Sequence, residues 1–373
     1  MSGRQLGRVI GGDTLGGVTE PAELPTLLDI SDEIAWPDSD AEATTQARLH
    51  AAGLGDGALG RLGELAGWLS AVQGVSPPRE PQRPRLVLFR ADGVDRDDIA
   101  TVFADVAGVG VRIVDLTADP SGGEDPPPSN PAVSTPADET PADETPADET
   151  PADDGDDVLS AGAVDAAIRA GARVADDEVD AGADLLIAAA AGPATPSSDV
   201  VVSVMALIEP VKVVGLTTTL SDEQWMTWVA AVRDARLRGL PHRHEVADLL
   251  ASVGGLELAA LTGFLLRAAA RRTPVLLDGV AAAAAALLAR EVAPNVVRWW
   301  QPGAGSTRPA HALALEEFAG VPILGLQLRV GGGVGAVLAV PLLRAAARAV
   351  TELTTEVAAA DVDGLPFVDD DAT

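Results

Sequence analysis

Side chains that could do chemistry are few in this chain, and they fall in or beside glycine-containing turns. Asp278 and Gly279 directly follow an apolar run at 274–277, where a buried strand would end. A polar group at the carboxyl end of such a strand is a common ligand contact. An acid there also caps a following helix, and residues 281–290 are alanine-rich and helix-like. Both interpretations of Asp278 stay open.

Two further features could serve a ligand site. The glycine triplet Gly331 to Gly333 precedes a long apolar stretch, so its backbone amides could bind an anion at the start of a helix. The same triplet could be a flexible helix entry, which is the interpretation we favour. His311 could contact a ligand, although a lone histidine is more often an ordinary surface or core residue.

Composition limits the classes of function. The 373 residues carry a formal charge of −30, which argues against a nucleic-acid partner because phosphate binding needs clustered Lys and Arg. The chain has no cysteine, so thiolate catalysis and cysteine-ligated metal are excluded. With only four histidines, we expect neither a metal site nor a cofactor.

Acidic residues are concentrated in one segment. Residues 119–157 hold 13 acidic side chains and no basic one, and a Pro-Ala-Asp-Glu-Thr unit repeats between 136 and 150. A unit without large apolar residues cannot bury enough surface to offset its ordering entropy. We expect a disordered insertion, either simply solvated or docking a basic partner.

Hydrophobic periodicity predicts alternating strands and helices. Expected strands lie at 85–89, 111–115, 184–189, 211–215, 274–278, 295–300 and 321–328. Expected helices lie at 57–74, 94–107, 158–181, 199–208, from 221, at 256–271, 281–290 and 333–353. This order is typical of an α/β, doubly wound, mostly parallel sheet, here with a smaller helical part from the N-terminal region and the C-terminal helix. Ligands of such sheets bind in the loops at the carboxyl ends of the strands.

The predicted organisation has four parts. They are a divergent N-terminal extension at 1–52, an α/β domain with a helical subdomain at 53–118 and 158–355, the acidic insertion at 119–157, and an acidic tail at 356–373. Residues 1–10 lack the apolar core of a signal peptide, and the longest apolar candidate, 275–289, is interrupted by Asp278. We therefore expect a cytoplasmic protein with no membrane span.

Three segments carry a resemblance to a known family. They read Ala-Gly-Ala-Asp-Leu-Leu-Ile at 181–187, Gly-Gly-Leu-Glu-Leu-Ala-Ala-Leu-Thr-Gly at 254–263, and Arg-Arg-Thr-Pro-Val-Leu-Leu-Asp-Gly at 271–279. In order and spacing, the chain resembles the nicotinate-nucleotide:dimethylbenzimidazole phosphoribosyltransferase family. The resemblance implies that nicotinate leaves ribose C1 of nicotinate mononucleotide and that a benzimidazole nitrogen replaces it. It also implies a homodimer.

The resemblance departs from the family at the expected ligand loops. The family loop Leu-Arg-Leu-Gly-Glu-Gly-Thr-Gly-Ala aligns with residues 328–336, so its general-base glutamate falls on Gly332. Its acidic turn falls on Ala189, its basic pair on Thr227 and Trp228, and the glutamate of its His-x-Ser-x-Glu-Pro-Gly-His region on Arg308. Losing a positioned general base costs typically 10²–10⁴-fold in rate.

The positions that match the family remain the candidate substrate contacts. They are Asp92, Gly215, Asp278, Gly279, His311, Gly331 and Gly333. We carry two hypotheses: a phosphoribosyltransferase of cobalamin lower-ligand synthesis with weak or lost activity, and a non-catalytic paralogue that binds a ligand or a partner such as an intact homologue. The missing base and basic pair together favour the second.

Overall fold

The computed structural model describes residues 27–55, 57–91, 99–117, 158–192, 195–216 and 220–363. Asp92, the threonine run at 217–219, the acidic repeat and the last ten residues lie outside these ranges. The predictions made for them therefore stay predictions.

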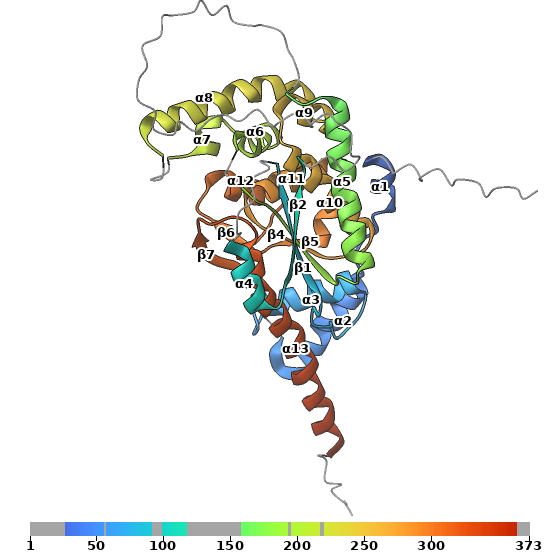
Figure 1. Cartoon of the computed structure of the whole chain (residues 1–373). Coiled ribbons are helices and arrows are strands. Elements are labelled where there is room, and N and C mark those ends of the chain that lie inside the picture. Colours follow the sequence, from blue (N-terminus) through green and yellow to red (C-terminus); the bar gives the residue numbers. More distant parts are fainter. Residues whose placement is uncertain are drawn as a thin grey trace, which may run out of the picture.

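A parallel sheet forms the centre of the molecule (Figure 1). Its order is β2-β1-β3-β4-β5, and a second parallel pair, β6-β7, continues beside β5 through the Ile323 to Pro302 backbone bond. The strands are β1 Pro84–Arg90, β2 Gly110–Asp115, β3 Leu185–Ala190, β4 Val275–Leu277, β5 Trp300–Pro302, β6 Ala304–Ser306 and β7 Leu324–Leu328. The predicted α/β architecture is confirmed.

Helices cover both faces of this sheet. They are α1 Leu27–Glu33, α2 Ser39–Leu49, α3 Arg61–Gln73, α4 Ile99–Ala107, α5 Ala161–Asp180, α6 Pro196–Met205, α7 Pro210–Val214, α8 Asp222–Gly239, α9 Val246–Val253, α10 Leu256–Ala270, α11 Gly279–Val292, α12 Pro309–Glu317 and α13 Val334–Asp363. Short helical turns lie at η1 His50–Leu54, η2 Leu240–His242 and η3 Pro294–Trp299.

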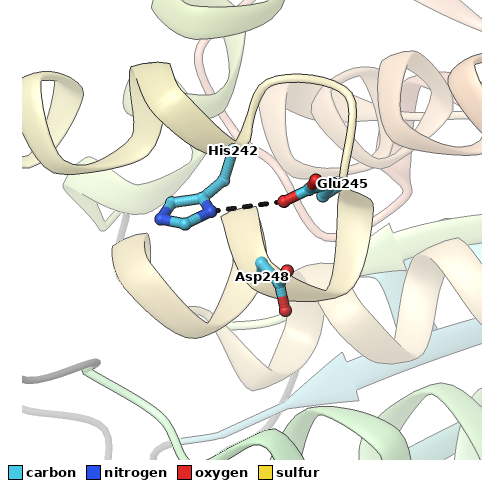
Figure 2. A group of neighbouring side chains, drawn as sticks. All are labelled: His242, Glu245 and Asp248. Atoms are coloured by element: carbon cyan, nitrogen blue, oxygen red, sulfur yellow. Dashed lines mark ion pairs between the residues drawn. The ribbon is translucent and has the colours of Figure 1, made fainter.

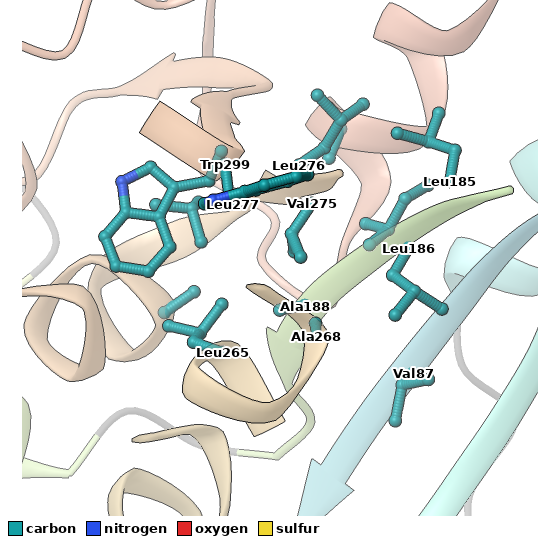
Figure 3. Close-up of a cluster of buried hydrophobic side chains, with 14 of the residues drawn as sticks. Val87, Leu185, Leu186, Ala188, Leu265, Ala268, Val275, Leu276, Leu277 and Trp299 are labelled. Atoms are coloured by element: carbon teal, nitrogen blue, oxygen red, sulfur yellow. The ribbon is translucent and has the colours of Figure 1, made fainter. Parts of the chain in front are cut away.

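Strand β1 shows why both faces must be covered. Its Phe89 ring packs edge-on against Phe264 of α10, with ring centroids 5.5 Å apart. Leu86 points to the opposite face, because side chains alternate along a strand, and it lies against Gly333 at the start of α13. Both residues are fully buried, and so are the central side chains of β3 and β4 with Leu265 of α10 (Figure 3).

The N-terminal helices and the C-terminal helix form the smaller helical part. Helices α2 and α3 pack together, and α13 packs on α3 and on α4 (Figure 1). A buried hydroxyl pair, Thr45 and Ser70, joins α2 to α3 at 2.6 Å. Trp68 of α3 donates to the carbonyl of Arg298 at 3.0 Å, which ties this part to the loop before β5.

In the part of the chain that the structure describes, one helix is long and apolar enough to cross a membrane. The window Val334–Leu353 of α13 qualifies, although the sequence analysis had found no such run. Within the fold, 56% of that window is buried, and the buried side chains belong to the core that α3, α4 and the sheet share. The apolar character of α13 is therefore explained by packing.

Two predicted strands are wrong. Residues 211–214 lie in α7, which ends before Gly215, and residues 295–299 lie in the turn η3, so that β5 begins only at Trp300. In both cases a proline occupies the first or second helical position, where its fixed φ favours a helical start. A short apolar run alone does not distinguish a buried strand from a buried helical turn.

The tightest helix contact generates a test of the packing. A Cβ on Gly263 of α10 would overlap the carbonyl oxygen of Ile168 in α5, and a Cβ on Gly171 would overlap that of Ala260. We expect Gly263→Ala to lower the free energy of unfolding by about 1–3 kcal/mol, because backbone must move apart. Gly162→Ala, in open space on the same α5, should be neutral or slightly stabilising. Urea unfolding of both variants measures the difference, and equal stabilities would contradict the close approach.

Candidate functional site

The carboxyl end of β4 carries the most constrained polar group of the sheet. Asp278 follows β4 directly and is 6% exposed. It occupies the N-cap position of α11, yet its side chain makes no capping bond to that helix. Gly279, the first residue of α11, has φ 81°, a backbone conformation that favours glycine.

The Asp278 carboxylate instead binds the start of α13. Its Oδ2 accepts from the amide of Gly333 at 3.0 Å, and its Oδ1 accepts from the amide of Ala336 at 3.1 Å. The first amides of a helix have no partner within the helix, so an anion there is stabilised by hydrogen bonds and by the helix dipole. The acceptor at this glycine-rich helix entry is therefore the protein's own carboxyl group, that of Asp278.

Burial dominates the ionisation of this carboxyl group. Burial raises the pKa of Asp278 to about 7, although hydrogen bonds from the backbone N–H groups of Ala336, Gly333 and Gly335 lower it. In the unfolded chain the group ionises near pH 4. The native state thus holds this proton up to about neutral pH.

The glycine triplet is shaped for a tight helix entry. Gly332 has φ 70° and Gly333 has φ 87°, both in the left-handed region. Gly331 is exposed and Gly332 is half-buried, whereas Gly333 is buried against Leu86. The structure thus brings Asp278 and the triplet together, and Gly332 offers no side chain that could accept a proton.

A second cluster joins three elements near the start of α12. Arg308, the N-cap residue of α12, donates through Nη2 to both oxygens of Asp199 in α6, at 2.9 and 2.8 Å. Trp228 of α8 donates through Nε1 to the same carboxylate at 2.8 Å. The Arg308 guanidinium also lies over the Trp228 ring, 5.9 Å from its centroid, a cation–π distance.

The acid in this cluster is fully buried while the arginine is not. Asp199 is 0% exposed, whereas the Arg308 side chain is 34% exposed. Burial raises the pKa of Asp199, and the charge of Arg308 and the bonds from Trp228 and Arg308 counteract it. An ion pair of this kind fixes the position of the arginine rather than adding much stability, because desolvating the acid is costly.

Gly215 and His311 lie beside this cluster. Gly215 has φ 61°, its carbonyl accepts from Trp225 Nε1 at 2.7 Å, and a Cβ there would overlap Pro309, the first residue of α12. His311, in the first turn of α12, is 1% exposed, and neither ring nitrogen has a hydrogen-bond partner among the described residues. Burial, helped by the charge of Arg308, lowers the pKa of His311 to about 4, so the ring is neutral at pH 7.

Sequence reasoning found some of these residues and missed others. It named Asp278, the triplet, Gly215 and His311, and the structure groups the first two together and the last two together. Asp199 was not singled out, since an acid in the first turn of a predicted helix resembles ordinary dipole compensation. Of the predicted site residues, Asp92 lies outside the described part of the chain.

Three side chains elsewhere could offer ligand atoms to a metal ion. His242, Glu245 and Asp248 lie around the start of α9 with ligand atoms within 4.8 Å of one another (Figure 2). His242 Nδ1 lies 3.6 Å from Glu245 Oε2. Acids at a helix start are stabilised by the helix dipole, and the glutamate and the aspartate are exposed, so the grouping is explained without an ion.

A cavity of about 640 Å³ lies between the N-terminal helices and β5. Its lining includes Arg61, Trp68, Trp300 and Phe318. None of the predicted site residues within the described ranges lines it. The cavity is therefore separate from the two polar clusters.

Comparison with known proteins gives this arrangement a family. A family profile described as phosphoribosyltransferase matches residues 34–102 and 94–362. A nicotinate-nucleotide–dimethylbenzimidazole phosphoribosyltransferase of Mycobacterium marinum is 40% identical over 346 residues, covering 86% of this chain and 92% of the relative. A protein of the same name from Mycobacterium avium is 40% identical over 345 residues, covering 86% and 95%.

Solved structures agree with the sequence comparison. The crystal structure of CobT from Thermus thermophilus superposes with a TM-score of 0.66 at 26% identity, covering 84% of this chain and 96% of that one. The chain therefore belongs to a phosphoribosyltransferase family of α/β fold. That family is the CobT family of nicotinate-nucleotide:dimethylbenzimidazole phosphoribosyltransferases, which serves cobalamin lower-ligand synthesis.

The Asp278 contact to α13 can be tested by an isosteric change. In Asp278→Asn, one side-chain atom becomes an NH₂ group facing a backbone amide, so a buried donor loses its acceptor. We expect the free energy of unfolding to fall by about 1–3 kcal/mol. Asp234→Asn, which changes an exposed acid paired with Arg233, should shift it by less than about 0.5 kcal/mol.

The pH dependence of that difference has a defined sign. Because the native pKa of Asp278 is raised, the stability it contributes is present below about pH 4 and is lost as the pH rises to about 7. The stability gap between wild type and Asp278→Asn should therefore narrow over that range. Chemical denaturation at about pH 4.5, 6 and 7.5 measures it, and a gap that widens with pH would contradict the assignment.

Proposed function

We propose that this protein binds nicotinate mononucleotide and transfers its phosphoribosyl group to a benzimidazole-type base, at a rate far below that of relatives with a glutamate in the loop before the C-terminal helix. The carrying observation is the geometry around Gly332. The family's general-base glutamate aligns there, and the carboxylate that the fold brings to this loop, that of Asp278, is buried and bound to two amides of α13.

The chemistry explains why turnover should suffer more than binding. As the benzimidazole nitrogen attacks ribose C1 and nicotinate leaves, the ring acquires positive charge, and its second nitrogen must release a proton. A positioned acceptor lowers that barrier, typically by 10²–10⁴ in rate. Without one, the proton passes to solvent. Substrate binding does not require this group.

A second candidate is the non-catalytic paralogue. The absence of a carboxylate at Gly332 and at Ala189, together with Trp228 where the family has a basic residue, favours it. In that role the protein would bind a nucleotide or an intact homologue in the cytoplasm, as a homodimer by resemblance. It predicts no release of nicotinate under any condition that leaves the protein folded.

Restoring the carboxylate separates the two candidates. Gly332→Glu should raise the rate of α-ribazole phosphate formation by about 10²–10⁴ at saturating substrate, since it supplies the missing acceptor. Gly332→Gln is the matched control, because both variants carry a similar side chain at φ 70° and share the strain of about 1–2 kcal/mol. Nicotinate release and product formation, followed by chromatography with 5,6-dimethylbenzimidazole as acceptor, are the measurements.

Three outcomes decide the proposal. A slow wild type, a fast Gly332→Glu and a slow Gly332→Gln would support a weakened transferase. Wild-type turnover within tenfold of the Mycobacterium relatives would show that the missing base is replaced, and would contradict the predicted weakness. No turnover in wild type or in a folded Gly332→Glu would leave the paralogue as the better account.

A further inference from the structure

Arg308 is held in an unusual way for an arginine that only completes an ion pair. It reaches Asp199 through Nη2 alone, and among the described residues neither Nε nor Nη1 makes a hydrogen bond. The side chain is 34% exposed, so these donors are open to solvent. A guanidinium held through Nη2 therefore keeps the N–H groups of Nε and Nη1, which lie on different edges of the planar group, and each can donate a separate hydrogen bond to a ligand.

The surroundings fix the orientation of the Arg308 guanidinium. The buried Asp199 carboxylate anchors one end, and the Trp228 ring supports the planar face. The Trp228 indole N–H donates to Asp199, which holds the Asp199 carboxylate in place beside Arg308. A pre-oriented arginine loses little conformational entropy when it donates a charge-assisted hydrogen bond to an oxyanion.

The start of α12 adds positive potential beside Arg308. Arg308 is the N-cap residue of α12, where the helix dipole adds positive potential. His311, in the next turn, is buried, and neither of its ring nitrogens has a partner among the described residues. Gly215 also lies against Pro309, the first residue of α12.

We propose that Arg308 binds an oxyanion, namely the phosphate of a phosphoribosyl nucleotide, and so carries the cation of the substrate site on the N-cap of α12 instead of on α8. This proposal deepens the proposed function and rests on it for the identity of the nucleotide. The resemblance agrees with this assignment, because it implies that the family's basic pair falls on Thr227 and Trp228 of α8 and that a family glutamate falls on Arg308.

Charge balance favours phosphate over carboxylate. Asp199 offsets one unit of charge, so the pair alone is close to neutral. A phosphate monoester carries a charge of about −1.5 to −2 at pH 7 and has three acceptor oxygens. It therefore interacts more strongly with the charge and the N–H groups of Arg308 than a carboxylate does. Inorganic phosphate should therefore bind weakly, and the nucleotide should bind more tightly through its other contacts.

Four probes measured by calorimetry separate the possible sources of the oxyanion. They are inorganic phosphate, nicotinate mononucleotide, nicotinamide mononucleotide, which has the phosphate without the carboxylate, and nicotinate riboside, which has the carboxylate without the phosphate. In Arg308→Gln, both mononucleotides should bind roughly ten- to hundredfold more weakly, as expected for the loss of charge-assisted hydrogen bonds. Nicotinate riboside should change by less than about twofold.

Two further variants protect the test against simple unfolding. Arg308→Gln leaves the buried Asp199 without its cation, which could destabilise the protein. The double variant Asp199→Asn/Arg308→Gln removes both charges and keeps an acceptor for Trp228, so it should regain stability without regaining phosphate-dependent affinity. Arg348→Gln, which breaks an exposed ion pair with Glu80, controls for loss of a surface charge and should bind all probes as wild type does.

Each outcome is decisive. Equal affinity for nicotinate mononucleotide in wild type and the folded double variant would overturn the role of Arg308 while leaving the proposed function standing. A loss for nicotinate riboside equal to that for the mononucleotides would overturn the assignment to phosphate. If inorganic phosphate binds in an Arg308-dependent way and neither mononucleotide binds, the oxyanion site is supported. Nicotinate mononucleotide is then contradicted as the substrate. Binding of no probe by wild type would overturn both.

Discussion

The hydrogen bonds from α13 to Asp278 determine how the central sheet and the C-terminal helix fit together. They join the end of β4 to the amides of Gly333 and Ala336. Because α13 also packs on α3 and α4, this carboxyl group helps to place the smaller helical part, together with the shared core and the Trp68 bond to the Arg298 carbonyl. Burying an acid is costly, and here the cost is offset by amides that would otherwise lack partners. The glycine loop is thereby held against the core at Gly333.

Much of the fold could be predicted because local signals and tertiary packing agree. The apolar runs that became β1, β2 and β3 are bounded by turn residues, and Ser221 forms the predicted start of α8, with a capping box to Gln224. Prediction failed at 211–215 and 295–299, where the runs are short and a proline begins a helical turn. There the number of residues was too small for either periodicity to stand out.

The candidate site was predictable only in pieces. Asp278 and the glycine triplet each carried a local signal, but the bond between Asp278 and Gly333 spans 55 residues and follows from the topology of the sheet. The sequence allowed Asp278 to cap α11, and the fold turned it to α13 instead. Asp199 and Arg308 lie 109 residues apart, and no local sequence pattern around either residue predicts that they form an ion pair.

Under the proposed function, the missing general base and the missing basic pair differ in whether another residue of the fold can replace them. A cation for phosphate binding needs charge and direction within several ångströms, so an arginine on another helix that reaches the same space can serve, as Arg308 does in our proposal. A proton acceptor must stand within hydrogen-bond reach of one nitrogen, and the Asp278 carboxyl group beside the loop is already bound to the backbone amides of α13. In our proposal, nucleotide binding and turnover are therefore separable, because binding can survive a move of the cation to another helix, whereas turnover depends on the side chain at position 332.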